Sequence, residues 1–159
     1  MRGLYLITND DPLQFLLEKL DVALATGNIA ILQYRRKKVA RVAQPSEVQQ
    51  IKALCEKYQV PFVINDDLAL AEQFGLGVHL GQSDGEIIDA TARLPEGVII
   101  GRTCLNSLEL AEKAIAEGAT MLPGQIADTL RDAYHGGDVL QILHRPAVCV
   151  SAQRPLLRG

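Results

Sequence analysis

The chain has 159 residues, 48% hydrophobic and 22% charged, which suits one globular domain with its own core and excludes a disordered protein. Its net charge of −3 gives no support to nucleic-acid or anionic-membrane binding, and the first apolar run, 3–8, is too short for a signal peptide or a membrane span. Three scattered cysteines without CxxC spacing argue against a disulfide framework or a zinc site, so we expect a cytoplasmic protein.

Short apolar runs alternate with segments of helical periodicity along the first 120 residues. The apolar runs predict strands at 3–8, 28–35, 61–66, 76–81 and 97–103. The segments between and after them predict helices at 13–24, 46–58, 68–74, 86–94 and 107–117. Candidate helix-start residues are Ser46, Asp67 and Asn106. Because such alternation gives parallel strands joined by helical crossovers, the sequence predicts an α/β fold.

The predicted strands are nearly all apolar, which is typical of a sheet covered on both faces. No GxGxxG follows the first strand, where a dinucleotide-binding fold would have it. Polar residues instead crowd the C-terminal ends of the strands, which favours a TIM-barrel-like arrangement over an open doubly wound sheet. The length allows about five to six (β/α) units rather than eight, so we expect an incomplete barrel.

The composition changes after Thr120. Neither Glu nor Lys occurs from Met121 onwards, and the expected sixth strand is interrupted by Pro123 and Gly124. Helical fragments at 126–134 and 138–144 and a strand-like run at 146–152 are expected in this part. We therefore predict a partial barrel over 1–120 and an atypical tail over 121–159, a break that a shifted reading frame or a truncated copy would leave.

A basic cluster follows the second predicted strand. Alternation places Ile31, Gln33 and Arg35 on one face of that strand, with Lys37 just beyond it. A guanidinium and an ammonium group suit a phosphate or a diphosphate. The alternative, a basic surface turn after a buried strand, stays equally open on this pattern alone.

Acidic residues end the third and fourth predicted strands. Asn65, Asp66 and Asp84 offer the hard oxygen ligands that Mg²⁺ prefers, and such a cation would neutralise a diphosphate held by Arg35 and Lys37. The alternative is that the acids cap helices: Asp66 or, in preference, Asp67 at the helix 68–74, and Asp84 at the helix near Glu86. Taken alone, each acid favours this structural role.

Two further polar residues lie on predicted strands or at their ends. His79 lies inside an apolar strand, which favours a hydrogen-bonded structural histidine over a catalytic base. Thr103 ends the fifth strand, where its hydroxyl can reach a ligand.

Five segments in order resemble the thiamine-phosphate synthase family: LYLITND, Q-x-R-x-K, PFVINDD, GVHLGQSD and VIIGRT. They span residues 3 to 120. The resemblance implies a TIM barrel that joins hydroxymethylpyrimidine diphosphate to a thiazole phosphate, giving thiamine phosphate and diphosphate with the help of Mg²⁺. The diphosphate leaves from a pyrimidine carbocation that the thiazole nitrogen captures, so no protein nucleophile is implied.

The resemblance also implies roles for particular residues. Asp66 and Asp84 would bind Mg²⁺, and Arg35 and Lys37 would act in catalysis by stabilising the departing diphosphate. Substrate contacts would come from Gln33, Arg35, Lys37, Asn65 and Thr103. Arg102 replaces a usual small apolar residue, a departure that would crowd the site.

The later family motifs, including the glycine-rich phosphate loop, are not recognisable in the tail. A second hypothesis is therefore a non-catalytic partial barrel that retains diphosphate and Mg²⁺ binding. A third, a thiazole tautomerase, is disfavoured because Asp66 and Asp84 favour metal–diphosphate chemistry. Because an incomplete barrel exposes sheet edges, we expect a homo-oligomer in which two copies cover each other's open edge, or a tail folded across that edge.

Overall fold

The computed structural model describes residues 3–105, 107–122 and 150–151. These residues form two compact units, the first made of Gly3–Phe62 with the segment 150–151, and the second of the described residues from Val63 onwards. The helical fragments expected at 126–134 and 138–144 lie outside the described residues.

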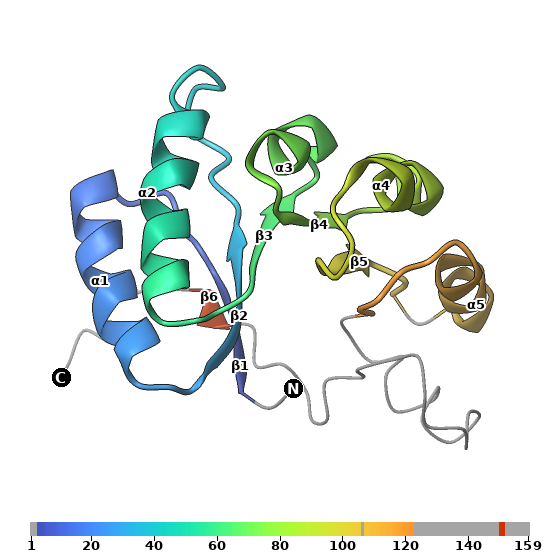
Figure 1. Ribbon diagram of the computed structural model, residues 1–159, viewed down its shortest axis with the longest axis horizontal. Helices are drawn as coiled ribbons and strands as arrows, with labels where there is room; N and C mark the ends of the chain where they lie inside the picture. Colours follow the sequence, from blue (N-terminus) through green and yellow to red (C-terminus); the bar gives the residue numbers. More distant parts are fainter. Residues whose placement is uncertain (1–2, 106, 123–149, 152–159) are drawn as a thin grey trace, which may run out of the picture. The chain divides into compact units, whose positions relative to one another are not determined.

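The first unit contains two strand–helix pairs, in which the strands run parallel and the helices α1 and α2 lie side by side (Figure 1). Its elements are β1 (Leu4–Ile7), α1 (Leu13–Ala25), β2 (Ile29–Tyr34) and α2 (Gln44–Lys57). The helical periodicity of apolar residues in the sequence corresponds to the buried face of α1. This helix buries Leu16, Leu20 and Leu24, which lie one turn apart.

The other edge of β1 is paired with a short strand from the end of the chain. β6 (Val150–Ser151) runs parallel to β1, with Val150 opposite Leu6 and Ser151 opposite Ile7. The strand-like run expected at 146–152 is therefore found in part, and it lies on the edge that we expected a partner or the tail to cover. Self-association stays a prediction.

The second unit contains three further strand–helix pairs, and its strands are parallel in the order β3-β4-β5 (Figure 1). Its elements are β3 (Phe62–Asn65), α3 (Leu68–Phe74), β4 (Gly77–Leu80), α4 (Ile87–Arg93), β5 (Ile100–Arg102) and α5 (Leu108–Ala116). The register places Asn65 beside His79 and His79 beside Gly101. Polar ends of neighbouring strands are thereby brought to one level, which positions the candidate site.

Of the sixth strand expected near Thr120, the described residues include one bridge. Met121 pairs with Gly101 in the parallel sense, and Arg102 N–H donates to Met121 O over 3.1 Å. The chain thus continues along β5 for one step before Leu122, the last described residue of this segment.

Two helices in the second unit begin at side-chain caps. The Asp67 carboxylate accepts a hydrogen bond from Leu70 N–H over 2.9 Å, as predicted for this residue. The cap of α5 is Ser107, whose hydroxyl accepts from Leu110 N–H over 3.2 Å. The sequence prediction of Asn106 was one residue early, and Asn106 itself lies outside the described residues.

The predicted start of α2 at Ser46 was wrong by two residues. The helix begins at Gln44 with Pro45 in its first turn, where the missing N–H of proline has no helical partner to lose. Ser46 therefore lies inside the helix.

The α/β class is confirmed, with five strand–helix units among the described residues, in agreement with the five to six that were predicted. The boundary predicted at residue 120 stays a prediction. Among the described residues, no helix is both long enough and apolar enough to cross a bilayer.

Burial makes the described cysteines poor nucleophiles, since it raises the pKa of Cys55 to about 12 and the pKa of Cys104 above its ordinary value. At pH 8 we expect a thiol reagent to label native Cys55 more slowly than the denatured chain by a factor of roughly 10³ from the thiolate fraction alone. Mass spectrometry of labelled peptides in a Cys149→Ser background measures both rates. Equal rates in the native and denatured chains would contradict the burial of Cys55.

Candidate active site

The Asp66 carboxylate is held between two donors at the C-terminal ends of β3 and β4. Oδ1 accepts from Gly81 N–H over 3.1 Å, and Oδ2 accepts from the Asn65 side-chain amide over 2.7 Å. Asp66 has a left-handed backbone with φ 61°, a conformation that short acidic residues tolerate better than most, and its N–H donates to His79 O over 2.8 Å. The turn at Asp66 thus brings its carboxylate within hydrogen-bonding distance of Gly81, directly after β4.

Asp84 lies on the same side of Gly81 as Asp66. A Cβ built at Gly81 would overlap Oδ2 of Asp84 and lie 3.6 Å from Oδ1 of Asp66. The two carboxylates therefore both approach the space where a side chain at Gly81 would be. Asp84 is not the cap of α4, because that helix begins after Glu86 without a side-chain cap.

Two carboxylates in this arrangement fit Mg²⁺, which is usually bound by one or two protein carboxylates and completes its octahedron with water and phosphate oxygens. No group of three or more His, Cys, Asp or Glu that could hold a metal ion occurs within the described ranges. A pair of acids is a donor set suited to a cation that is also bound by phosphate oxygens.

His79 is a buried strand residue with a hydrogen bond, as the sequence predicted. Its Nε2 lies 2.8 Å from Oγ1 of Thr103, which follows β5. Gly101 gives the ring its space, because a Cβ there would approach Nδ1 of His79 to 2.7 Å and Cε of Met121 to 2.7 Å. The imidazole thus fixes the Thr103 hydroxyl at the end of the sheet.

Arg102 binds the loop that carries Asp84. Its guanidinium donates to Gly85 O over 2.5 Å and to Gln82 O over 3.3 Å. The Gln82 side-chain amide in turn donates to Thr103 O. The unusual arginine therefore ties the loop 82–85 to the end of β5, a role that the sequence did not suggest.

Of the predicted basic face in the first unit, Gln33 is buried whereas Arg35 and Lys37 are exposed on the loop beyond β2. The Gln33 side-chain amide donates to the Tyr5 hydroxyl over 3.0 Å. The Arg35 N–H donates to Thr8 Oγ1 over 2.8 Å. Tyr5 and Thr8 were missed by the sequence reasoning.

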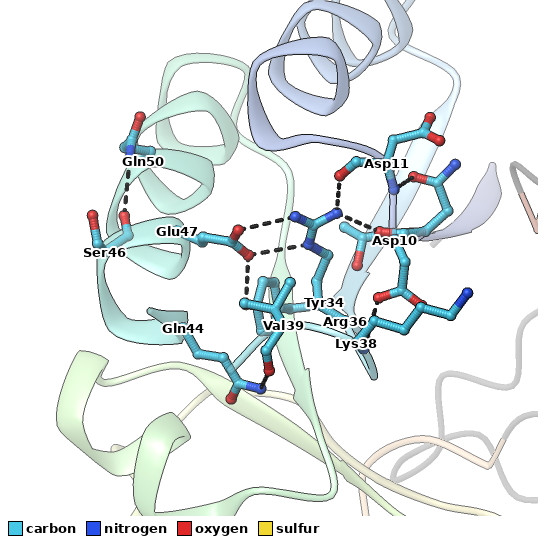
Figure 2. A network of polar contacts seen from close by, with 12 residues as sticks. Asp10, Asp11, Tyr34, Arg36, Lys38, Val39, Gln44, Ser46, Glu47 and Gln50 are labelled. Carbon is cyan, nitrogen blue, oxygen red and sulfur yellow. Dashed lines mark hydrogen bonds and ion pairs between the residues drawn. The ribbon is translucent and has the colours of Figure 1, made fainter. Parts of the chain in front are cut away.

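In a basic surface turn, the side chain of Arg36 would be exposed to solvent. Arg36 is instead buried, with only 2% of its side chain exposed. It makes a two-pronged ion pair with Glu47 of α2, with Nη2–Oε1 2.9 Å and Nε–Oε2 3.1 Å (Figure 2). The Tyr34 hydroxyl donates to Oε2 of Glu47 over 2.8 Å. Burial and this hydrogen bond to a carboxylate raise the pKa of Tyr34, so its proton stays in place.

The chain is similar to proteins of one known family. The family model described as thiamine monophosphate synthase matches residues 4–130. The chain belongs to this family. It is also similar to the solved structure of a thiamine phosphate pyrophosphorylase from Pyrococcus furiosus, with a TM-score of 0.70 and 26% identity. That match covers 86% of this chain and 71% of the other.

Within this family member, the structure brings some of the predicted site residues together. Asn65, Asp66 and Asp84 form one cluster around Gly81, and Thr103 is linked to the same loop through Gln82. Gln33, Arg35 and Lys37 belong to the first unit, where they follow β2. That they share one ligand with the two acids stays a prediction.

Proposed function

We propose that this chain is a thiamine-phosphate synthase that joins hydroxymethylpyrimidine diphosphate to a thiazole phosphate, releasing diphosphate. The observation that supports the proposal best is the pair of carboxylates, Asp66 and Asp84, which lie on the same side of Gly81 in a member of the thiamine monophosphate synthase family. Such a pair can hold the metal that assists the departure of diphosphate, and this reaction needs no protein nucleophile.

Asp66 and Asp84 would hold Mg²⁺, which supplies charge neutralisation to the leaving diphosphate when it is bound. Arg35 and Lys37 would stabilise the same developing negative charge through charge-assisted hydrogen bonds. The amides of Gln33 and Asn65 would orient the substrate.

In the proposed reaction, the bond between the pyrimidine methylene carbon and the diphosphate oxygen breaks, and the bonding electrons leave with diphosphate. The thiazole nitrogen supplies the electron pair of the new carbon–nitrogen bond. The Thr103 hydroxyl, fixed by His79, would add a hydrogen bond to the diphosphate.

A second candidate is a partial barrel that binds diphosphate and Mg²⁺ without turnover. It is favoured by the extent of the structural match, which leaves part of the pyrophosphorylase chain without a counterpart here. We propose a homo-oligomer for either case, in which a second copy would extend the short pairing that β6 gives β1 and that Met121 gives β5.

The test is an assay of thiamine phosphate formation from both substrates with Mg²⁺, with Asp84→Asn beside the original chain. We expect the substitution to lower turnover by roughly 10² or more, the usual effect of removing a group that stabilises a leaving charge. Asp89→Asn, an exposed acid on α4, is the matched control and should leave turnover unchanged.

Product formation that Asp84→Asn does not alter would refute the metal assignment. Absence of product from the original chain, combined with calorimetric binding of inorganic diphosphate, would favour the non-catalytic candidate. Absence of both would exclude the two readings together.

A further inference from the structure

We propose that Arg36 and Glu47 are positioning residues that fix the loops after β1 and β2, and thereby hold Arg35 and Lys37 in place for a diphosphate. The inference deepens the proposed function, on which the identity of the ligand rests. It concerns only the first unit, and Figure 2 shows the ion pair between Arg36 and Glu47 on which it rests.

Arg36 binds two other segments of the chain, α2 and the loop after β1. Two of its nitrogens bind Glu47 of α2, as described above. Its Nη1 also donates to two backbone carbonyls of the loop after β1, Asn9 O at 2.8 Å and Asp11 O. A guanidinium has a rigid fork of donors, so these four acceptors determine both its place and its plane.

The same two loops are joined by further hydrogen bonds. Arg35 N–H donates to Thr8 Oγ1 over 2.8 Å, and Lys38 N–H donates to Asp10 Oδ1 over 3.1 Å. Because Arg36 lies between Arg35 and Lys37, anchoring it fixes the backbone of both exposed cations. Their side chains then point outward from a backbone that is held on both sides.

The energetics favour a role in orientation over one in stability alone. Two buried charges lose their hydration, and a pair of well-packed apolar residues would often be as stable or more stable. An apolar pair, however, offers no donor to the carbonyls of Asn9 and Asp11. The buried ion pair is therefore needed to position the loop after β1, whereas the fold of the unit could be maintained by an apolar pair.

The experiment compares the chain with the double variant Arg36→Met/Glu47→Leu, which replaces the buried charges with apolar groups of similar size. Two quantities are measured: hydrogen exchange of the Arg35 and Lys38 amides, and calorimetric affinity for inorganic diphosphate with Mg²⁺. The single variant Glu47→Gln, which keeps the shape of the side chain, is measured in the same way. Thermal unfolding identifies which variants are folded.

We expect both amides to exchange at least about tenfold faster in a folded variant, because their loops lose the anchor. We expect diphosphate affinity to fall by about tenfold, the lower end of what the loss of an orienting partner costs a metal site. Glu72→Gln is the matched control, because it removes an Arg–Glu pair, Arg93–Glu72, that is exposed. It should change neither quantity.

Unchanged amide exchange in a folded double variant would overturn the inference. So would faster exchange with unchanged diphosphate affinity, since loop order would then not serve binding. If the original chain binds no diphosphate, the proposed function fails, and the exchange data alone decide whether the pair orders the two loops.

Discussion

Replacing Glu47 by alanine is expected to lower the free energy of unfolding by about 3–5 kcal/mol, a large part of the stability of a small domain. The reason is burial, since the Arg36 and Glu47 side chains are 2% and 9% exposed. Without the carboxylate, the buried guanidinium of Arg36 has no counter-ion and keeps only its hydrogen bonds to backbone carbonyls. The Tyr34 hydroxyl also loses its hydrogen-bond acceptor. Urea denaturation at pH 7 measures the change.

Glu72→Ala provides the comparison for this loss. It breaks an Arg–Glu pair whose side chains are 44% and 45% exposed, and such pairs contribute about 0–1 kcal/mol. Equal losses in the two variants would mean that the Arg36–Glu47 pair is as solvated as the surface pair, and would contradict the burial that the structure assigns to it.

The sequence predicted the order of strands and helices because each helix buries a regular stripe and each strand is short and apolar. Strand ends were predicted less well. The run 97–103 was taken as one strand, whereas β5 begins only at Ile100, because Gly97 with φ 86° still belongs to the turn after α4. The composition of a short apolar run predicts that a strand is present. Such a run has no periodic pattern that would show at which residue the strand begins.

That Asp66 and Asp84 lie near each other could be predicted from the sequence. Each follows an apolar strand, and the C-terminal ends of neighbouring parallel strands lie at one edge of the sheet. What composition could not give is Gly81, whose missing side chain lets both carboxylates approach the same point. A glycine beside a strand end has many possible reasons, and only coordinates separate close approach from a turn.

The Arg36–Glu47 pair was missed for a different reason. In the run Arg35–Lys38 nothing distinguishes the buried residue from its exposed neighbours, because a loop has no fixed side-chain period. Glu47 also resembles an ordinary acid in the first turn of a helix, where the helix dipole favours it. The burial of Glu47 could have been predicted from its position in the apolar stripe of α2, one turn before Ile51. An unpaired carboxylate at such a position would be energetically costly, which indicates that it has a partner.

Gly81→Ala is expected to impair Mg²⁺-dependent diphosphate binding while leaving the fold nearly unchanged. The backbone of Gly81 lies outside the left-handed region, so alanine is conformationally allowed there. The added methyl group would occupy the position of the Asp84 carboxylate, which must rotate away. A carboxylate at the end of a flexible side chain moves at small energetic cost, so we expect a stability loss within about 1 kcal/mol.

The proposed metal site should tolerate the Gly81→Ala substitution less well than the fold does. Arg102 holds the loop through Gly85 O and Gln82 O, so the backbone cannot readily follow the displaced Asp84 side chain. Mg²⁺ demands near-ideal octahedral geometry, and a misplaced ligand is therefore equivalent to a lost one. We expect the midpoint of a Mg²⁺ titration of diphosphate binding to rise by about tenfold or more. Ser83→Ala, in the same exposed loop, should leave that midpoint in place, and an unchanged midpoint in Gly81→Ala would show that the Asp84 carboxylate is not a ligand.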